Sequence, residues 1–260
     1  MFPSKRRADR DLGDHDRVPQ PVLAVLHHLD PPDLGLAEAP LRAADLHLDE
    51  RSPTAGEPLP RLDEVDGILS LGGGQSAVDL AAEPALAAEA ALLRDAVAAQ
   101  VPVLGVCLGG QLLAAALGAE VRRASRRTVA WRALRPTGAA DGDPVAAAFG
   151  PAVRALHWNE DVFALPPGAA EVLTRDGEGV EAFRAGPCAW GLQFHPEAGA
   201  AVLDGWYAGY AQWLAEAGVT EAAARAADAE HLPAQAHLAA RLFGAFAAVV
   251  RERAQARVRG

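Results

Sequence analysis

A short apolar segment that runs into a cysteine flanked by glycines constrains this chain more than any other feature. Residues 103–106 have the length and the β-branched content of a buried strand, and the run Gly-Val-Cys-Leu-Gly-Gly occupies residues 105–110. Residues 111–117 are rich in alanine and leucine, which favours a helix that ends near Gly118. Because glycine tolerates backbone conformations that other residues resist, the sequence predicts a strand, a sharp turn at Cys107 and a helix.

Cys107 by itself allows two interpretations. A small apolar cysteine at a strand end is commonly a buried core residue. The start of the following helix, however, offers unpaired N–H groups and a positive dipole end, which favour a thiolate over a thiol. Residues 191–197, Gly-Leu-Gln-Phe-His-Pro-Glu, support the second interpretation because they add a base and a carboxylate. We therefore predict that Cys107 is a nucleophile, that His195 takes its proton and that Glu197 orients the imidazole.

A second glycine-rich turn follows the apolar segment 67–71. Three consecutive glycines, Gly72 to Gly74, can present bare backbone N–H groups to a developing oxyanion. The turn is not a P-loop, because no Gly-Lys-Ser/Thr follows it. It is not a dinucleotide fingerprint either, because Ala77 occupies the position of the third glycine.

Together, these three stretches resemble the class I glutamine amidotransferase family, and in particular free-standing proteins similar to the amidotransferase half of GMP synthetase. In that family a Gly-x-Cys-x-Gly-x-Gln motif carries the nucleophile, and residues 105–111 match it. A His-Pro-Glu element carries the base and its orienter, which correspond to residues 195–197. A Gly-Gly turn after an early strand corresponds to residues 72–73. The resemblance covers residues 21–250.

The resemblance implies which residues form the site. The N–H groups of Gly73 and Leu108 are expected to form the oxyanion hole. The expected substrate contacts are Gly72, Gln111, Trp158, Asn159, Glu160 and Asp161. Relatives commonly have His-Gly where this chain has Asn159-Glu160, near the amino-acid end of the substrate. Which γ-glutamyl compound is accepted therefore stays open, and Glu160 is either a partner for a substrate ammonium group or an exposed loop charge.

The alternation of short apolar strands and helices predicts an α/β fold, a mostly parallel sheet with helices on both faces. The resemblance implies a flavodoxin-like class I amidotransferase architecture with extra C-terminal helices. Strands are expected at residues 22–28, 45–49, 67–71, 103–106 and 129–134, and a hairpin at 171–175 and 180–184; helices are expected at 84–99, 202–217, 221–229 and 234–253. In such sheets the site lies at the carboxyl ends of the strands.

The N-terminal segment and the overall composition indicate the extent of the domain and exclude several classes of partner. Residues 1–20 lack an apolar stretch and are expected to be a disordered leader, whereas residues 21–255 are expected to form a single domain. The net charge of −10, without a basic stripe, argues against nucleic acid as a partner. No uncharged apolar run reaches the roughly 18 residues that cross a bilayer. The two cysteines form no disulfide or zinc motif, so we expect reduced thiols, a cytoplasmic location, no metal and no cofactor.

Four further features have a preferred interpretation. The pair His27-His28 is expected at the surface, and Cys188 is expected to be a small buried residue. A basic cluster is expected to be a solvated strand edge rather than an anion site; it comprises Arg122, Arg123, Arg126 and Arg127. An aromatic stripe is expected to pack against the sheet; it comprises Trp206, Tyr207, Tyr210 and Trp213.

The resemblance implies cleavage of the side-chain amide of glutamine, or of a γ-glutamyl amide, through a cysteine thioester, with release of ammonia and glutamate. Three interpretations remain open. The chain is a subunit that supplies ammonia to a separate synthetase, a γ-glutamyl amide or peptide hydrolase that acts alone, or a non-catalytic regulatory relative. The complete set of Cys107, His195 and Glu197 argues against the third.

Overall fold

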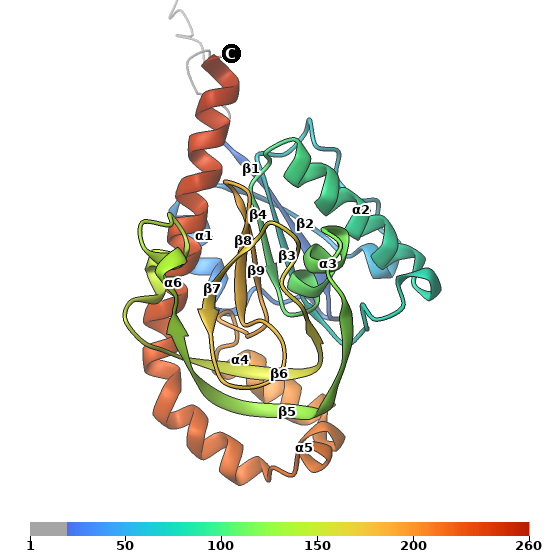
Figure 1. Cartoon of the computed structure of the whole chain (residues 1–260), viewed down its shortest axis with the longest axis vertical. Helices are drawn as coiled ribbons and strands as arrows, with labels where there is room; N and C mark the ends of the chain where they lie inside the picture. Colours follow the sequence, from blue (N-terminus) through green and yellow to red (C-terminus); the bar gives the residue numbers. More distant parts are fainter. Residues whose placement is uncertain (1–19, 260) are drawn as a thin grey trace, which may run out of the picture.

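One mixed sheet forms the centre of the molecule. The computed structural model describes residues 20–259, so the predicted leader lies outside the described residues except for Gln20. Nine strands pair in the order β2-β1-β3-β4-β9-β8-β7-β5-β6 (Figure 1). The strands are β1 Val22–His28, β2 His47–Arg51, β3 Gly67–Gly73, β4 Val103–Val106, β5 Val121–Pro136, β6 Val153–Phe163, β7 Ala170–Thr174, β8 Ala182–Ala185 and β9 Ala189–Leu192.

The helices follow the strands in the order that a doubly wound sheet requires. They are α1 Glu38–Ala43, α2 Pro84–Ala98, α3 Leu108–Ala116, α4 Ala200–Gly209, α5 Ala211–Ala217 and α6 Glu221–Arg259. Strands β2, β1, β3, β4 and β9 pair in parallel, and β8, β7, β5 and β6 extend the sheet with antiparallel pairs. The parallel part has the flavodoxin-like order, so the predicted fold class is confirmed.

Alternating side chains of the strands face two different layers of helices. In β1, Leu23 and Val25 belong to the core on the side of α1 and α6, whereas Ala24 and Leu26 belong to the core on the side of α2 and α3. All four side chains are fully buried. This two-residue period on a doubly covered sheet explains why β1 is apolar from Val22 to Leu26 rather than alternating with polar residues.

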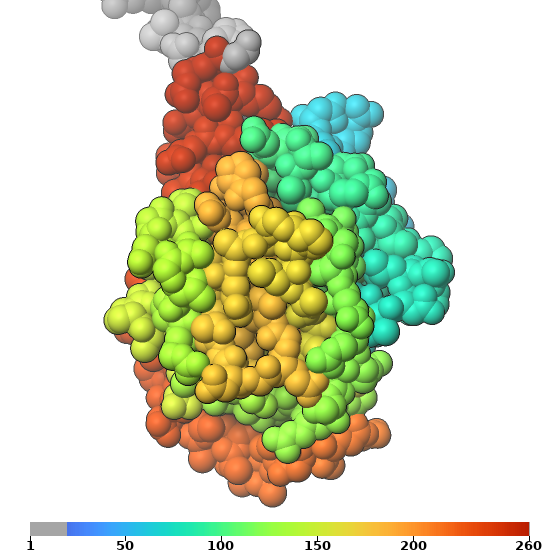
Figure 2. Space-filling model, in the orientation of Figure 1, coloured from blue at the N-terminus to red at the C-terminus, as the bar shows by residue number. Residues whose placement is uncertain are grey.

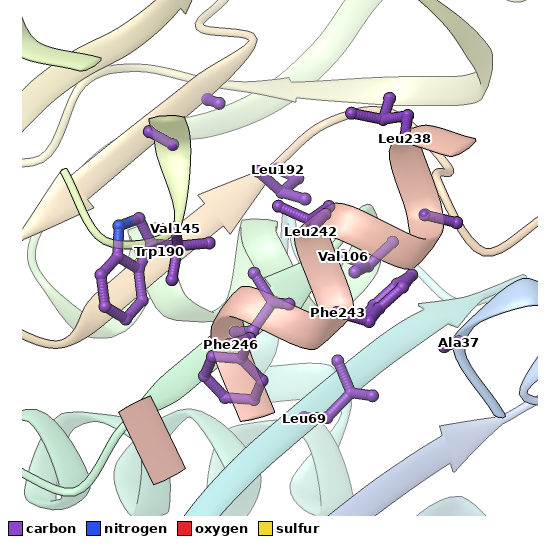
Figure 3. Packing of buried hydrophobic residues seen from close by; sticks show 14 of the residues in the cluster. Ala37, Leu69, Val106, Val145, Trp190, Leu192, Leu238, Leu242, Phe243 and Phe246 are labelled. Atoms are coloured by element: carbon purple, nitrogen blue, oxygen red, sulfur yellow. The ribbon is translucent and has the colours of Figure 1, made fainter. Parts of the chain in front are cut away.

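Helix α6 covers one face of the sheet with large side chains. Figure 3 shows Leu242, Phe243 and Phe246 of this helix packed toward Leu69 and Val106 of the central strands. Each of these side chains is fully buried. The cluster therefore fastens the C-terminal helix to strands that end at the candidate site.

The predicted break between residues 229 and 234 is wrong, because α6 runs for 39 residues through Pro233. Proline in a helix interior costs about 3 kcal/mol. Buried residues on both sides, Asp228 and Leu238 among them, hold the two halves on the body of the protein and offset this cost. The last turns of α6 project beyond the packed body (Figure 2), where Val258 is exposed.

Several other boundaries differ from the predicted ones. The predicted helix 202–217 is two helices, α4 and α5, that meet at Tyr210. Strand β5 begins at Val121 and not at the predicted residue 129. The basic cluster therefore belongs to this long strand instead of preceding it. Strands β5 and β6 form a long hairpin that α4 and α5 cover with a third apolar cluster. Across residues 20–259, every helix is too short or too polar to cross a bilayer.

Candidate active site

Cys107 lies at the tip of a strained turn between β4 and α3. Its backbone has φ +50° and ψ −106°, a conformation that residues other than glycine rarely adopt. The flanking glycines permit the turn because a Cβ at Gly105 would lie 2.5 Å from the carbonyl oxygen of Gly109. A Cβ at Gly109 would lie 2.2 Å from the carbonyl oxygen of Ser70. The structure therefore has the strand, turn and helix that the sequence predicts at this position.

His195 and Glu197 follow β9 and lie next to this turn. The backbone N–H of His195 donates to the carbonyl oxygen of Leu156 at 2.9 Å, which fixes the segment against β6. The Nδ1 atom of His195 donates to Glu197 Oε1 at 2.7 Å. This bond leaves Nε2 on the side of Cys107, where the carbonyl oxygen of Trp158 lies 3.3 Å from Nε2 and 4.0 Å from Cys107 Sγ.

The environment of His195 favours its protonated form. Burial alone lowers the pKa of this imidazole, but the charges of Cys107 and Glu197 and their hydrogen bonds outweigh burial and hold the pKa well above its ordinary value. Both ring nitrogens also face acceptors, Glu197 Oε1 and the Trp158 carbonyl. A histidine with acceptors at both nitrogens is satisfied only when both carry a proton.

The glycine turn at the end of β3 lies against His195 and Cys107. A Cβ at Gly72 would lie 2.9 Å from His195 Cε1 and 3.5 Å from Cys107 Cβ. A Cβ at Gly73 would lie 3.0 Å from Leu108 Cδ2. Leu108 is the first residue of α3, so its N–H has no acceptor within the helix. The two predicted oxyanion-hole residues therefore lie side by side at the turn of Cys107.

Five of the six predicted substrate contacts lie on β6 and in α3, and the sixth, Gly72, lies on β3. The side-chain amides of Gln111 and Asn159 both donate to the carbonyl oxygen of Asp161 at 3.1 Å. The Ser76 hydroxyl donates to Asp161 Oδ2 at 2.6 Å. Burial raises the pKa of Asp161. Within residues 20–259, the buried Asn159 Oδ1 has no hydrogen-bond partner.

Glu160 lies on β6 and is not an exposed loop charge. Its carboxylate forms ion pairs with Arg123 and Arg127, the latter at 2.6 Å. Its side chain is only 18% exposed. Arg122 in turn pairs with Glu178. Three arginines of the predicted basic cluster are thus ion-paired, while Arg122 and Arg123 stay exposed on β5, as expected for a solvated strand edge.

The expectation that His27 and His28 lie at the surface is wrong, since both are buried. His28 Nε2 lies 2.8 Å from Glu89 Oε2, and His28 Nδ1 lies 3.1 Å from the carbonyl oxygen of Leu71. The Ser70 hydroxyl donates to Glu89 Oε1 at 2.6 Å. This buried network lies beneath the glycine turn. The only signal in the sequence is the position of the histidine pair at the carboxyl end of the first parallel strand.

The aromatic stripe packs on the sheet as predicted, and it also borders the candidate site. Trp206 and Tyr207 contact Trp158 of β6, with ring centroids 5.4 and 5.6 Å away. Trp206 also meets the imidazole of His195 edge-on, at 4.8 Å. Cys188 is buried, as predicted.

A cavity of about 500 Å³ opens beside His195 and Glu197. The glycine turn forms one side of it, and the loop after β1 forms another. Helices α4 and α5 form the third side. The carboxyl ends of β1, β3, β4 and β9 therefore meet at one place, as expected for a doubly wound sheet.

Comparison with solved structures supports the same architecture. A glutamine amidotransferase from Thermotoga maritima superimposes with a TM-score of 0.79 at 27% identity, over 88% of this chain and 99% of that chain. A glutamine amidotransferase from Methylobacillus flagellatus superimposes with a TM-score of 0.75 at 24% identity, over 88% of this chain and 95% of that chain. The second likeness concerns the fold alone.

Sequence comparison identifies the family. The glutamine amidotransferase-like protein YfeJ of Salmonella typhimurium is 32% identical over 167 residues, which span 63% of this chain and 70% of that protein. One of the subunits of the glutamine-hydrolysing GMP synthase of Sulfolobus acidocaldarius is 33% identical over 99 residues, or 37% of this chain and 51% of that protein. Residues 44–205 match the family described as glutamine amidotransferase class-I. The chain therefore belongs to the class-I glutamine amidotransferase family.

Proposed function

We propose that this protein hydrolyses the side-chain amide of glutamine, or of a γ-glutamyl compound, with Cys107 as nucleophile, His195 as base and acid, and Glu197 as orienter. The observation that carries the proposal is the convergence of these three side chains at one buried turn. Membership of the class-I family supports the same chemistry. Because His195 Nδ1 is hydrogen-bonded to Glu197 Oε1 at 2.7 Å, Nε2 is the ring nitrogen that exchanges a proton with the Cys107 thiol.

The reaction proceeds in two halves. The Cys107 thiolate attacks the amide carbon, a C–S bond forms, and the imidazolium of His195 gives a proton to the leaving nitrogen as the C–N bond breaks. The products of this half are a γ-glutamyl thioester and ammonia. Water then attacks the thioester with His195 as general base, and glutamate leaves as the thiol is restored.

The oxyanion of each tetrahedral intermediate is stabilised by the N–H groups of Gly73 and Leu108. Loss of one such donor typically costs about 3 kcal/mol of barrier, a factor of about 10² in rate. The absence of a side chain at Gly72 lets the substrate carbonyl approach between the glycine turn and Cys107.

The amino-acid end of the substrate lies on β6. Asn159 Oδ1 supplies an acceptor for its ammonium group, and Gln111 and the backbone of Trp158 complete the wall. The carboxylate of Asp161 lies beside this acceptor, where it accepts from Ser76 and pairs with Arg123 at 3.1 Å. The unpartnered, buried oxygen of Asn159 supports this assignment, because an isolated buried acceptor is costly unless a ligand satisfies it. Glu160 acts by neutralising Arg123 and Arg127 instead of binding substrate.

Two interpretations of the physiological role follow. The similarity to part of a GMP synthase supports a partner synthetase that consumes the ammonia. The cavity beside the triad supports a hydrolase that acts alone on larger γ-glutamyl amides. A non-catalytic regulatory role is disfavoured because the buried, ion-paired His195 has a structural cost without a catalytic use.

Ammonia release from glutamine tests the proposal. The native chain should release ammonia, and Cys107→Ala should abolish the release. Cys188→Ala is the matched control, because it removes the other buried thiol, which lies outside the candidate site. Equal release by Cys107→Ala and the native chain would contradict the proposal.

A further inference from the structure

The cavity beside the triad has the volume of a site for a whole organic ligand. Its volume is about 500 Å³. Ammonia, the leaving group of glutamine, is about the size of a water molecule, which occupies about 30 Å³ in the liquid. Cavities of about 300–1,000 Å³ are typical of sites for whole organic ligands. The space therefore fits a leaving group much larger than ammonia.

The cavity lies away from the residues assigned to the γ-glutamyl group. Gln111, Asn159 and Asp161 do not line it, whereas His195 and the glycine turn do. A substrate with its amide carbon at Cys107 thus extends its amino-acid end toward β6 and its nitrogen substituent into the cavity. This step rests on the proposed function.

Aromatic rings form the inner wall. Trp158, Trp206, Tyr210 and Trp213 all line the cavity. The wall begins at the catalytic base, since the Trp206 ring meets His195 at 4.8 Å. Aromatic faces bind alkyl chains through apolar contact and bind organic cations through their negative π-faces.

The outer rim is acidic. Asp30 and Asp33 are exposed residues of the loop after β1 that line the cavity, and the described residues contribute no lysine or arginine to its wall. Arg127 stacks on the Trp213 ring at 4.3 Å, but its charge is paired with Glu160 and Glu216. A positive group at the rim is therefore attracted, and a carboxylate there is repelled.

We infer that this site cleaves γ-glutamyl amides of organic amines whose apolar chain carries a second, positively charged group at its far end. Cys107 displaces the amine: the C–S bond forms, the C–N bond breaks, and His195 delivers its proton to the departing nitrogen. Water hydrolyses the thioester, so one γ-glutamyl amide and one water give glutamate and the free amine. The amine leaves through the cavity.

Two helical glycines allow the volume of the cavity to be reduced by mutation. Gly205 and Gly209 of α4 line it, and a Cβ at either position meets no atom within 4 Å. A leucine at Gly205 therefore reduces the cavity without a backbone clash, and it replaces the glycine with a better helix former. Gly244 of α6 is the matched control, because it is a helical glycine that is equally unobstructed and lies outside the cavity wall.

The test uses four substrates and the purified full-length protein. One substrate is glutamine. The other three are the γ-glutamyl amides of hexane-1,6-diamine, hexylamine and 6-aminohexanoic acid, and these three amines share a six-carbon chain and differ in the charge at its far end. We expect kcat/KM for the diamine amide to exceed the values for glutamine and for the acid amide at least 10-fold. Gly205→Leu should lower the ratio of diamine amide to glutamine at least 10-fold, and Gly244→Leu should not change it.

The other outcomes separate this inference from the proposed function. A preference for glutamine or for the acid amide overturns the inference and leaves Cys107 chemistry intact. If no amide is cleaved but a glutamine-like electrophile labels Cys107, the inference is also overturned, and a partner-gated site remains. If no amide is cleaved and Cys107 is not labelled, both the inference and the proposed function fail.

Discussion

The Nε2 atom of His195 lies 3.3 Å from the carbonyl oxygen of Trp158, so the imidazole faces an acceptor on the side of Cys107. Glu197 accepts a hydrogen bond from the other ring nitrogen, Nδ1. The same Trp158 carbonyl lies 4.0 Å from Cys107 Sγ. The same carbonyl group of β6 thus lies next to both His195 and Cys107, the proposed base and the proposed nucleophile.

Glu197→Gln should lower activity and move its pH dependence. The glutamine keeps an oxygen for Nδ1 but removes the negative charge that raises the pKa of His195. The alkaline limb of kcat should therefore shift to lower pH, because the imidazolium that protonates the leaving nitrogen is lost earlier. By analogy with neutralised triad carboxylates, kcat should fall by about 10²-fold or more. A pH–rate profile checks both effects, with the exposed Glu83→Gln as a control that shifts neither.

Gly72→Ala should inactivate the site without unfolding the protein. The new methyl group would lie 2.9 Å from His195 Cε1, so either the imidazole or the glycine turn must move. A displaced base should cost about 10²-fold in kcat. Gly74→Ala, two residues on in the same turn, would meet only the Tyr210 hydroxyl at 3.7 Å and should keep activity on glutamine. Equal activity of the two variants would rule out the close approach described for Gly72.

Glu89→Ala should destabilise the fold. Glu89 is fully buried, accepts a hydrogen bond from Ser70 and pairs with His28. Removal of one member of such a buried pair leaves its partner unsatisfied and costs about 3–5 kcal/mol. Urea unfolding measures the change in free energy. Glu83→Ala, at the exposed start of the same helix, should change it by less than about 0.5 kcal/mol.

Protonation of Glu181 should lower the stability of the protein in acid. Burial alone raises the pKa of Glu181, but the hydrogen bond and charge of His157, with the charge of Arg175, outweigh burial and lower the pKa. A lowered folded-state pKa contributes stability that is complete above the ordinary value of 4.5 and is lost as the pH falls through the lowered pKa. The unfolding free energies of the native protein and of Glu181→Gln should therefore differ at pH 7 and converge toward pH 2. A difference that stays constant over this range would contradict the assignment.

Local signals were sufficient for the central strands and the nucleophile turn. The strands at residues 22–28 and 103–106 are confirmed at both boundaries, because the first is an apolar run closed by two histidines and the second is a continuous apolar run that ends at Cys107. The positions of Cys107 and His195 followed from the rule that parallel strands end at one edge of the sheet. These features depend on neighbouring residues and on topology, both of which the sequence displays.

Long-range contacts explain what the sequence did not reveal. His28 is buried because Glu89, 61 residues away, reaches it from α2. Glu160 is neutralised by Arg127, 33 residues earlier on the partner strand of a hairpin. Pro233 remains helical because apolar packing on either side outweighs its local cost. In each case the deciding partner lies far along the chain, where neither periodicity nor motif spacing indicates it.

Covalent labelling with 6-diazo-5-oxo-L-norleucine, a glutamine-like electrophile, tests the central claim most directly. The full-length protein is treated, digested and analysed by mass spectrometry, beside His195→Ala. We expect one adduct, on the peptide that contains Cys107 and not on the peptide that contains Cys188, and a labelling rate at least 10-fold lower in His195→Ala. An unlabelled Cys107, or equal labelling of both cysteines, would contradict the account of Cys107 as the nucleophile for a γ-glutamyl group.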